Sequence, residues 1–257
     1  MPSSQWFVRL RAKTDPRVRL VCFTSAGAGA SSYGRWPDHL PADVETWAVQ
    51  LPGRETRRRE APLTDLMEIA NEINDRIEPL FDVPVAFFGH SMGALVAFEV
   101  ARRVQANGRA IVGLFVSGRA APDLRQGPEG LDKLSDNEFI DAMDREYGGV
   151  PSLLREDDEF RELYLPPLRA DATAVWAYHF ATGPVLECPI RVASGTDDLS
   201  VSRAALDAWA AFTLSDSRVT MFPGAHFYVN TARTALTRYV ATELNDMARS
   251  EIGRSVG

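Results

Sequence analysis

The stretch FFGHSMGALVAF, Phe87 to Phe98, places one serine between an apolar run and a series of small residues that suit a helix. Residues 89–93 read GHSMG and match G-x-S-x-G, with the strand-like VPVAFF before them and the helix-like ALVAFEVARR after them. A nucleophile on a tight strand-to-helix turn has a strained backbone, and glycines two positions to either side relieve the crowding that side chains would cause. This context favours Ser91 as a catalytic nucleophile over an ordinary Ser-Gly turn.

Apolar runs bounded by turn residues recur along the chain, and patterns with helical spacing, such as Leu66 to Leu80, lie between most of them. Runs this continuous suit strands that are covered on both faces, as in a mostly parallel sheet. The alternation predicts a doubly wound α/β sheet, and the length suits a single domain over residues 1–257. The expected strands are Val18 to Phe23, Val44 to Leu51, Val83 to Phe88, Ile111 to Ser117, Ile190 to Ser194 and Val219 to Phe222.

Residues 120–180 depart from this alternation, because they contain no convincing strand pattern. Ser135 and Glu138 form a capping-box pattern at the start of one expected helix. A second helix is expected to stop at Pro166-Pro167, and a third to span residues 170–180. The pattern predicts a helical lid that is inserted within the domain and lies over one edge of the sheet.

Composition limits the partners and the compartment. The net charge is −7 and the pI about 5.2, so the overall field gives no general attraction to nucleic acid or to anionic membranes. The N-terminus lacks a continuous apolar segment, and no run of about 18 apolar residues occurs, which favours a soluble cytoplasmic protein over a secreted or membrane-spanning one. Cys22 and Cys188 each lie beside an expected buried strand and are predicted to be reduced core thiols.

A serine nucleophile needs a base, and four histidines are available. His226, in FPGAHFYV, follows the last strand-like run, where a loop could reach back to Ser91. His90 is adjacent to the serine in sequence and is expected to point elsewhere. His39 sits in the polar PDHLPAD, as a surface residue would, and His179 could line a pocket or merely pack. The predicted base is therefore His226.

The acid that orients the base is expected after the penultimate strand, where IRVASGTDDLSV offers Asp197 and Asp198. Either one gives the chain order serine, aspartate, histidine, which is the order of the α/β-hydrolase fold. Asp123 is an outside candidate, because some hydrolases take the acid from the end of the preceding strand. The residues alone leave this choice open.

The negative oxygen that forms during acyl transfer needs two preorganised N–H donors. The N–H of Met92, directly after the nucleophile, is the first predicted donor. The second is expected in the loop TSAGAGASSY, whose small residues allow the backbone to approach a ligand, and Ala26 is the predicted donor there. A flexible glycine-rich turn without this role is the alternative.

With these residues in place, the chain resembles the type II thioesterases, the stand-alone editing hydrolases of polyketide and nonribosomal peptide synthesis. The resemblance extends from about Arg19 to Val240. In the family the acid is the third residue after the glycine of a G-x-x-D turn, which implies Asp198. One departure is Ser25, where the family usually has a histidine before the Ala-Gly of the first loop. The motifs that carry the resemblance are RLVCFTSAGAGASSY, VQLPGRETRRREAP, FFGHSMGALVAFEVAR, LPPLRADATAVWAY, CPIRVASGTDD and FPGAHFYV.

The resemblance implies a substrate and a partner. The substrate would be an acyl group in thioester linkage to the phosphopantetheine arm of an acyl or peptidyl carrier protein domain of a megasynthase. Hydrolysis would remove stalled or wrongly loaded chains. No metal or redox cofactor is expected, because the phosphopantetheine belongs to the substrate.

Two further sets of residues are candidates for substrate and partner binding. Apolar residues of the lid could cover the serine and limit acyl length, or could simply form the core of the helical layer. These are Phe139, Met143, Leu153, Leu154, Phe160 and Trp176. A dense basic turn could receive an acidic carrier protein, or could be a solvated loop. It contains Arg54, Arg57, Arg58 and Arg59.

Two other functions remain open. The same three catalytic side chains would serve a carboxylesterase or lipase that acts on oxygen esters. A hydrolase-like protein could also bind carrier proteins without catalysis, although such a module would be expected to lack one of the three residues.

Overall fold

The structure is a computed structural model that describes residues 5–127 and 130–255 of the 257-residue chain. Within those residues, a seven-stranded sheet has the order β1-β3-β2-β4-β5-β6-β7. β1 runs antiparallel to β3, and all other neighbouring strands are parallel. This arrangement confirms the predicted α/β fold class. The strands are β1 (Phe7–Arg11), β2 (Val18–Phe23), β3 (Val44–Val49), β4 (Val85–His90), β5 (Gly113–Ser117), β6 (Ile190–Gly195) and β7 (Ser217–Phe222).

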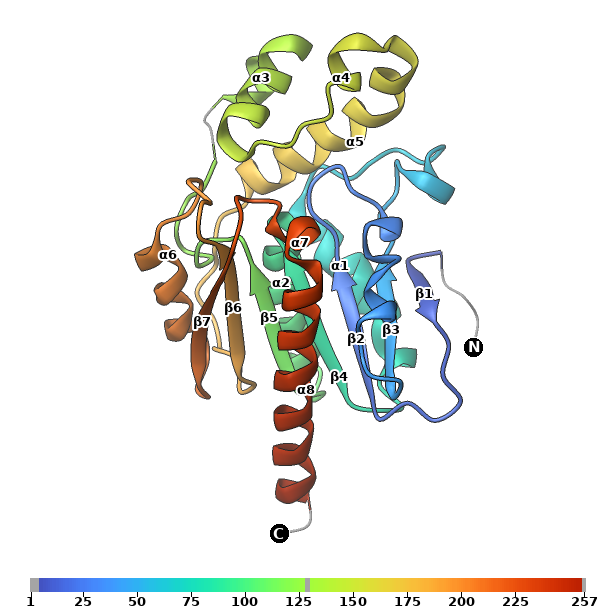
Figure 1. Cartoon of the computed structure of the whole chain (residues 1–257), viewed down its shortest axis with the longest axis vertical. Coiled ribbons are helices and arrows are strands. Elements are labelled where there is room, and N and C mark those ends of the chain that lie inside the picture. The colour runs from blue at the N-terminus through green and yellow to red at the C-terminus, as the bar shows by residue number, and fades with distance from the viewer. Residues whose placement is uncertain (1–4, 128–129, 256–257) are drawn as a thin grey trace.

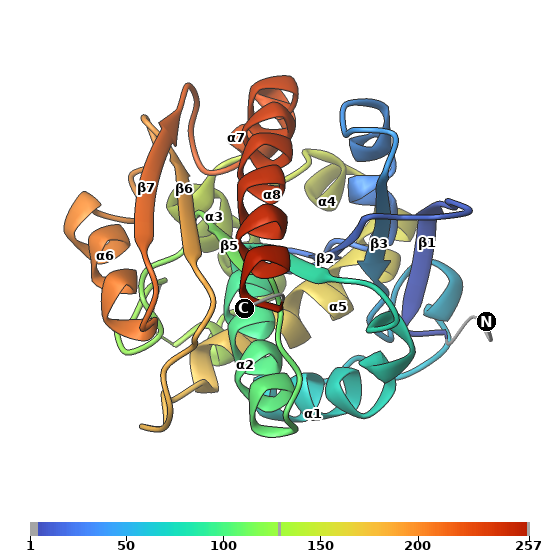
Figure 2. The ribbon, with the colours of Figure 1, turned by 90° about the horizontal axis from the view of Figure 1, so that it is seen from below.

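Helices cover both faces of the sheet (Figures 1 and 2). Helices α1 (Leu66–Ile77) and α2 (Met92–Ala106) pack on one face, together with α6 (Arg203–Asp207). Helices α7 (Tyr228–Thr231) and α8 (Arg233–Ser255) pack on the other. Every residue of β2, β3 and β4 is buried between these layers, which explains their continuous apolar sequences.

The lid lies above the carboxyl ends of the parallel strands, between β5 and β6 in the chain (Figure 1). It contains α3 (Asp136–Tyr147), α4 (Leu153–Glu156) and α5 (Asp158–Ala177). Helix α3 begins with the predicted capping box of Ser135 and Glu138. Inside the lid, Phe139, Ile140 and Leu165 contribute to a small apolar core of its own.

Helix α5 corrects the prediction of two separate helices, because it continues through Pro166 and Pro167. Each proline lacks an N–H and leaves the carbonyl four residues earlier without its helical partner. Those carbonyls belong to Glu162 and Leu163, which are exposed, so water can satisfy them. No helix in the described part of the chain is both long and apolar enough to cross a bilayer.

Candidate active site

Ser91 occupies the sharp turn between β4 and α2, with φ 55° and ψ −118°. A positive φ is strained for a residue with a side chain. Glycines make the turn possible: a Cβ on Gly89 would lie 2.1 Å from the Gly93 carbonyl oxygen, and one on Gly93 would lie 2.2 Å from the Phe23 carbonyl oxygen. The backbone therefore requires glycine at both outer positions of the motif.

The Ser91 hydroxyl is not used to cap the helix that follows it. At α1, by contrast, the carboxylate of Asp65 accepts hydrogen bonds from the N–H groups of Met67 and Glu68. Among the described residues, the Ser91 side chain makes no such bond at the start of α2. The Ser91 N–H donates to the Ser117 carbonyl at 2.8 Å, which fixes the turn to the end of β5. The hydroxyl remains available to the cavity that Ser91 lines.

Asp198 and His226 meet across the ends of β6 and β7. The Nδ1 atom of His226 lies 2.9 Å from Oδ2 of Asp198, and both side chains are buried. Oδ1 of Asp198 accepts hydrogen bonds from the N–H and hydroxyl of Ser200, at 3.0 and 2.6 Å. Burial raises the pKa of Asp198, but the hydrogen bonds from His226 and Ser200 outweigh it and leave the pKa below its ordinary value. Asp198 is therefore a carboxylate at neutral pH.

The parallel strands explain why residues so far apart in sequence converge. Ser91, Asp198 and His226 each follow the carboxyl end of a strand, and these ends share one edge of the sheet. Ser91 and His226 line the same cavity. The loop that carries His226 passes so close to β6 that a Cβ on Gly195 would lie 2.2 Å from the Gly224 carbonyl oxygen.

Of the other candidate acids and bases, only His90 lies beside Asp198 and His226. Asp197, Asp123, His39 and His179 are exposed. The expectation that His90 points elsewhere is wrong, because its ring packs 4.9 Å from that of His226, measured between centroids.

His90 belongs to a buried polar group that the sequence analysis missed. Its Nδ1 lies 2.9 Å from the Ser117 hydroxyl, which in turn lies 2.6 Å from the hydroxyl of Tyr228. Burial lowers the pKa of His90 well below its ordinary value, and the neighbouring His226 lowers it further. His90 is thus a neutral side chain that supports the ring of His226. Its position directly before Ser91 was the available signal.

A cavity of about 550 Å³ lies between the lid and the carboxyl edge of the sheet. Four of the predicted lid residues line it: Met143, Leu154, Phe160 and Trp176. The prediction is wrong for Phe139, which packs in the lid core, and for Leu153, whose side chain is 45% exposed. Helices α3 and α4 turn these two residues away from the cavity.

Met92 and Ala26 both line the cavity beside Ser91. Met92 is the first residue of α2, where backbone N–H groups have no partner within the helix. Ala26 lies in the glycine-rich loop after β2. Both predicted oxyanion donors therefore line the cavity that Ser91 lines.

The four-arginine turn is not a uniformly exposed surface. Arg54 and Arg57 are only 5% and 6% exposed, which makes the docking prediction wrong for both. Arg54 forms an ion pair with Asp171 of α5, and Arg57 with Glu60. These carboxylates neutralise the two buried guanidinium groups. Arg58 and Arg59 are exposed.

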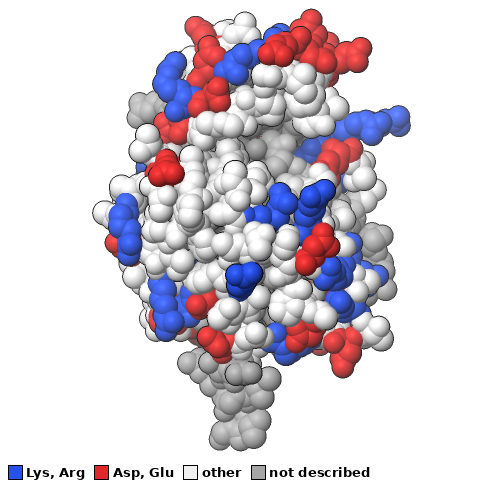
Figure 3. Space-filling view, in the orientation of Figure 1, with Lys and Arg blue, Asp and Glu red and all other residues white. Residues whose placement is uncertain are grey.

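Charge is unevenly distributed over the lid. Figure 3 shows acidic side chains gathered at its top, over the start of α5, with basic side chains on the flank of the body. Exposed acidic residues there include Glu156, Asp157, Asp158 and Glu159. Within residues 5–127 and 130–255, no three His, Cys, Asp or Glu side chains are grouped so that they could hold a metal ion.

Comparisons with known proteins show which family the chain belongs to. The family model of the thioesterase domain matches residues 18–244. The chain is 36% identical over 242 residues to the gramicidin S biosynthesis protein GrsT of Aneurinibacillus migulanus, and the match covers 94% of each chain.

Two solved structures are similar over nearly their whole length. One is the type II thioesterase BorB from the borrelidin biosynthetic cluster, with 33% identity, a TM-score of 0.84 and coverage of 95% of this chain and 98% of BorB. The other is YbtT, a type II thioesterase from the yersiniabactin NRPS/PKS pathway, with 30% identity, a TM-score of 0.85 and coverage of 94% and 99%. The chain therefore belongs to the thioesterase family, and within it to the type II thioesterases.

Proposed function

We propose that this protein hydrolyses acyl thioesters on the phosphopantetheine arm of acyl or peptidyl carrier protein domains, and so clears stalled or misprimed chains from a polyketide or nonribosomal peptide synthase. The observation that carries the proposal is the 2.9 Å contact of Asp198 with His226, beside the cavity that Ser91 also lines. The pathway context of the relatives supports the substrate class.

Acylation begins when His226 removes the proton from the Ser91 hydroxyl. The serine oxygen attacks the thioester carbonyl carbon, and the carbonyl oxygen becomes negative. The N–H groups of Met92 and Ala26 donate to that oxygen, and each such donor is worth on the order of 10² to 10³ in rate. The carbon–sulfur bond then breaks, and the proton held by His226 passes to the departing phosphopantetheine thiol.

Deacylation repeats these steps with water. His226 removes a proton from a water molecule, which attacks the ester carbonyl carbon of the acylated Ser91. The intermediate collapses to the free acid, and His226 returns its proton to the serine oxygen. Asp198 holds His226 in the required tautomer throughout and stabilises its protonated form. The reaction uses protein groups and water alone.

The lid cavity suits the apolar part of the acyl chain. Met143, Leu154, Phe160 and Trp176 line it and would be covered by acyl methylenes, with burial of each methylene contributing about 0.8 kcal/mol. Chain length is then limited by the space beneath α3 and α5.

The carrier protein would dock near the entrance to this cavity. Arg58 and Arg59 are exposed and follow the turn that packs against the loop after β2. Their charge complements an acidic carrier protein, and such contacts act chiefly on the rate of association and its salt dependence.

The test is to load one carrier protein with a series of acyl groups and to measure release of the free acid. We expect release by the native protein and none by Ser91→Ala. A matched oxygen ester of each acyl group is the control for substrate class. A strong preference for the oxygen ester would refute the thioesterase substrate, and failure of a serine-directed fluorophosphonate to label native Ser91 would refute catalysis altogether.

A further inference from the structure

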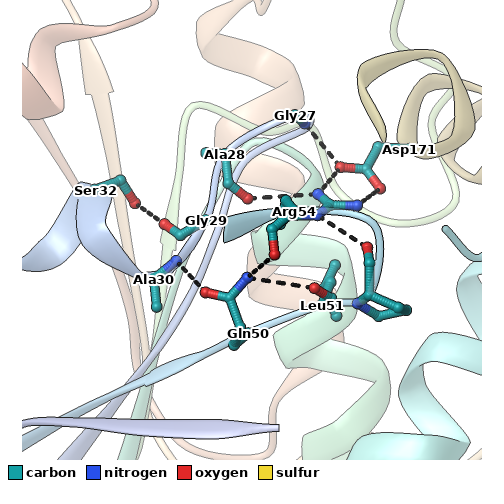
Figure 4. Close-up of polar contacts among 10 residues, drawn as sticks. Gly27, Ala28, Gly29, Ala30, Ser32, Gln50, Leu51, Arg54 and Asp171 are labelled. Atoms are coloured by element: carbon teal, nitrogen blue, oxygen red, sulfur yellow. Dashed lines mark hydrogen bonds and ion pairs between the residues drawn. The ribbon is translucent and has the colours of Figure 1, made fainter. Parts of the chain in front are cut away.

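One buried carboxylate connects the lid to the loop that carries Ala26. Asp171 lies on α5, and its side chain is fully buried. Its Oδ2 accepts a hydrogen bond from the Gly27 N–H at 2.7 Å. Both carboxylate oxygens also bind the guanidinium group of Arg54, at 2.5 and 2.9 Å (Figure 4).

The rest of this loop is held by side chains from the end of β3 and the turn after it. The amide oxygen of Gln50 accepts from the Ala30 N–H at 3.0 Å, and its amide nitrogen donates to the Arg54 carbonyl at 3.2 Å (Figure 4). Glu55 accepts from the Ser31 N–H at 3.2 Å. A loop rich in glycine has little conformational preference of its own. Its shape therefore depends on these tethers.

Gly27 is the point at which the loop touches α5. Its φ is 74°, and a Cβ there would lie 3.0 Å from Leu168 of the helix. The Gly27 N–H belongs to the peptide plane that joins it to Ala26. A hydrogen bond at this N–H fixes that plane, which includes the Cα and carbonyl of Ala26, and so restrains Ala26, whose own N–H lies in the preceding peptide plane. Asp171 already occupies the Gly27 N–H, so the donor predicted in this loop is the adjacent N–H of Ala26.

We propose that Asp171 is a positioning residue for the oxyanion hole: it orients the Ala26 N–H through its bond to Gly27, and Arg54 neutralises its charge. This inference rests on the proposed function. A lone carboxylate in a buried position beside the oxyanion would oppose the negative charge that develops there. The two-point contact with Arg54 removes that opposition and leaves the carboxylate free to accept the Gly27 N–H.

The pairing also explains two motifs of the sequence. Arg54 lies in VQLPGRE and Asp171 in LPPLRAD. The two residues are 117 positions apart in the sequence. Neither contributes directly to bond making. Together they link the lid helix to the site of negative charge, so the placement of α5 sets the geometry of the loop.

The experiment compares two double variants that both lack the ion pair. Arg54→Met with Asp171→Asn retains an amide oxygen that can accept the Gly27 N–H, whereas Arg54→Met with Asp171→Leu does not. We expect the asparagine variant to keep kcat within about threefold of native and the leucine variant to lose about 10²-fold, as for loss of one oxyanion donor. KM should change little in either, because the bond to the oxyanion forms in the transition state.

A second readout reports on the oxyanion hole directly. A boronic acid forms a tetrahedral adduct with Ser91, and we expect its affinity to fall in the leucine variant in parallel with kcat. The control is Arg191→Met with Glu243→Leu, which removes another largely buried ion pair at β6 and α8. This control should lose thermal stability without losing kcat.

The outcomes separate the two hypotheses. Equal kcat and equal boronate affinity in the two double variants would overturn the positioning role. A native protein that releases no acyl group from a carrier, but still shows the difference in boronate affinity, would overturn the proposed function alone. If the leucine variant does not fold, hydrogen exchange of the native peptide over residues 25–31 decides: exchange as fast as in an unstructured peptide would refute the role of Asp171.

Discussion

Replacement of Asp198 by asparagine should reverse the tautomer of His226. In the native protein, Oδ2 of Asp198 faces Nδ1 of His226, while Oδ1 accepts two hydrogen bonds from Ser200. Because Ser200 supplies donors at the Oδ1 position, the amide oxygen of Asp198→Asn would occupy it. The amide NH₂ would then face Nδ1, which must become an acceptor.

The size of the effect follows from this reversal. With Nδ1 as an acceptor, the proton of His226 resides on Nε2, which can no longer accept the proton of Ser91. Loss of the correct tautomer in a serine triad lowers kcat on the order of 10⁴-fold. This corresponds to roughly 5 kcal/mol of transition-state stabilisation. Since asparagine has the same size as aspartate, the fold should be retained.

The assay is single-turnover release of acid from an acylated carrier protein, with circular dichroism to check the fold. Asp197→Asn is the matched control, because that carboxylate is adjacent in sequence but exposed. We expect the control to retain native kcat. A folded Asp198→Asn variant that loses less than about tenfold in kcat would refute the assignment of Asp198 as the orienting acid, given the ~10⁴-fold loss that assignment requires.

Three other predictions concern the pH response, the acyl chain and the carrier protein. Burial holds the pKa of His90 below its ordinary value. Below pH about 6.5 the unfolded chain therefore binds a proton at this residue that the folded chain does not. The free energy of unfolding should decrease as the pH is lowered from about 6.5, by up to about 1.4 kcal/mol per pH unit. His90→Gln should flatten that slope in urea titrations between pH 6.5 and 5, and an unchanged slope would contradict it. Met143→Trp should reduce kcat/KM for a ten-carbon acyl group by about fourfold for each methylene that loses its contact, and should leave kcat/KM for an acetyl group unchanged. Equal losses for both substrates would show that Met143 does not contact the acyl chain. Reversing Arg58 and Arg59 to glutamate should raise KM for carrier-bound substrate and flatten its salt dependence without affecting a small soluble thioester; unchanged carrier kinetics would exclude docking at this turn.

The parts of the fold that are local in sequence could be predicted. Six strands were visible because each contains a short apolar run, and the bounds of β2 match the prediction at both ends. Five of these strands are buried throughout, whereas β7 at the sheet edge has only Phe222 buried. β1 was missed, because Phe7–Arg11 alternates apolar and charged residues and lies at the edge of the sheet. Helix α5 was divided in two because a proline pair is a strong stop signal from sequence alone. The exposure of Glu162 and Leu163, whose carbonyls lose their helical partners, depends on tertiary position.

In the site, too, local features could be predicted from the sequence, and features that depend on tertiary contacts could not. The elbow around Ser91 has a local signature, and the order of the strands then restricts where an acid and a base can follow. The choice of Asp198 over Asp197 needed either a family resemblance or the hydrogen bond to His226. Arg54 was predicted to be either a docking residue or part of a solvated loop, because its charge was visible and its partner was not. Asp171 is distant in sequence, and nothing near Arg54 indicates that the pair is buried.

The two prolines of α5 divide that helix into an outer and an inner segment that make different contacts. The segment after Pro167 includes Asp171, which anchors it to the body of the protein, and Trp176, which lines the cavity; the segment before Pro166 adds Phe160 to the cavity lining. Helices bend most readily where prolines interrupt the hydrogen-bond ladder. Natural variation or engineering can therefore reshape the outer half to suit a new cargo while the inner half keeps the reaction chemistry undisturbed.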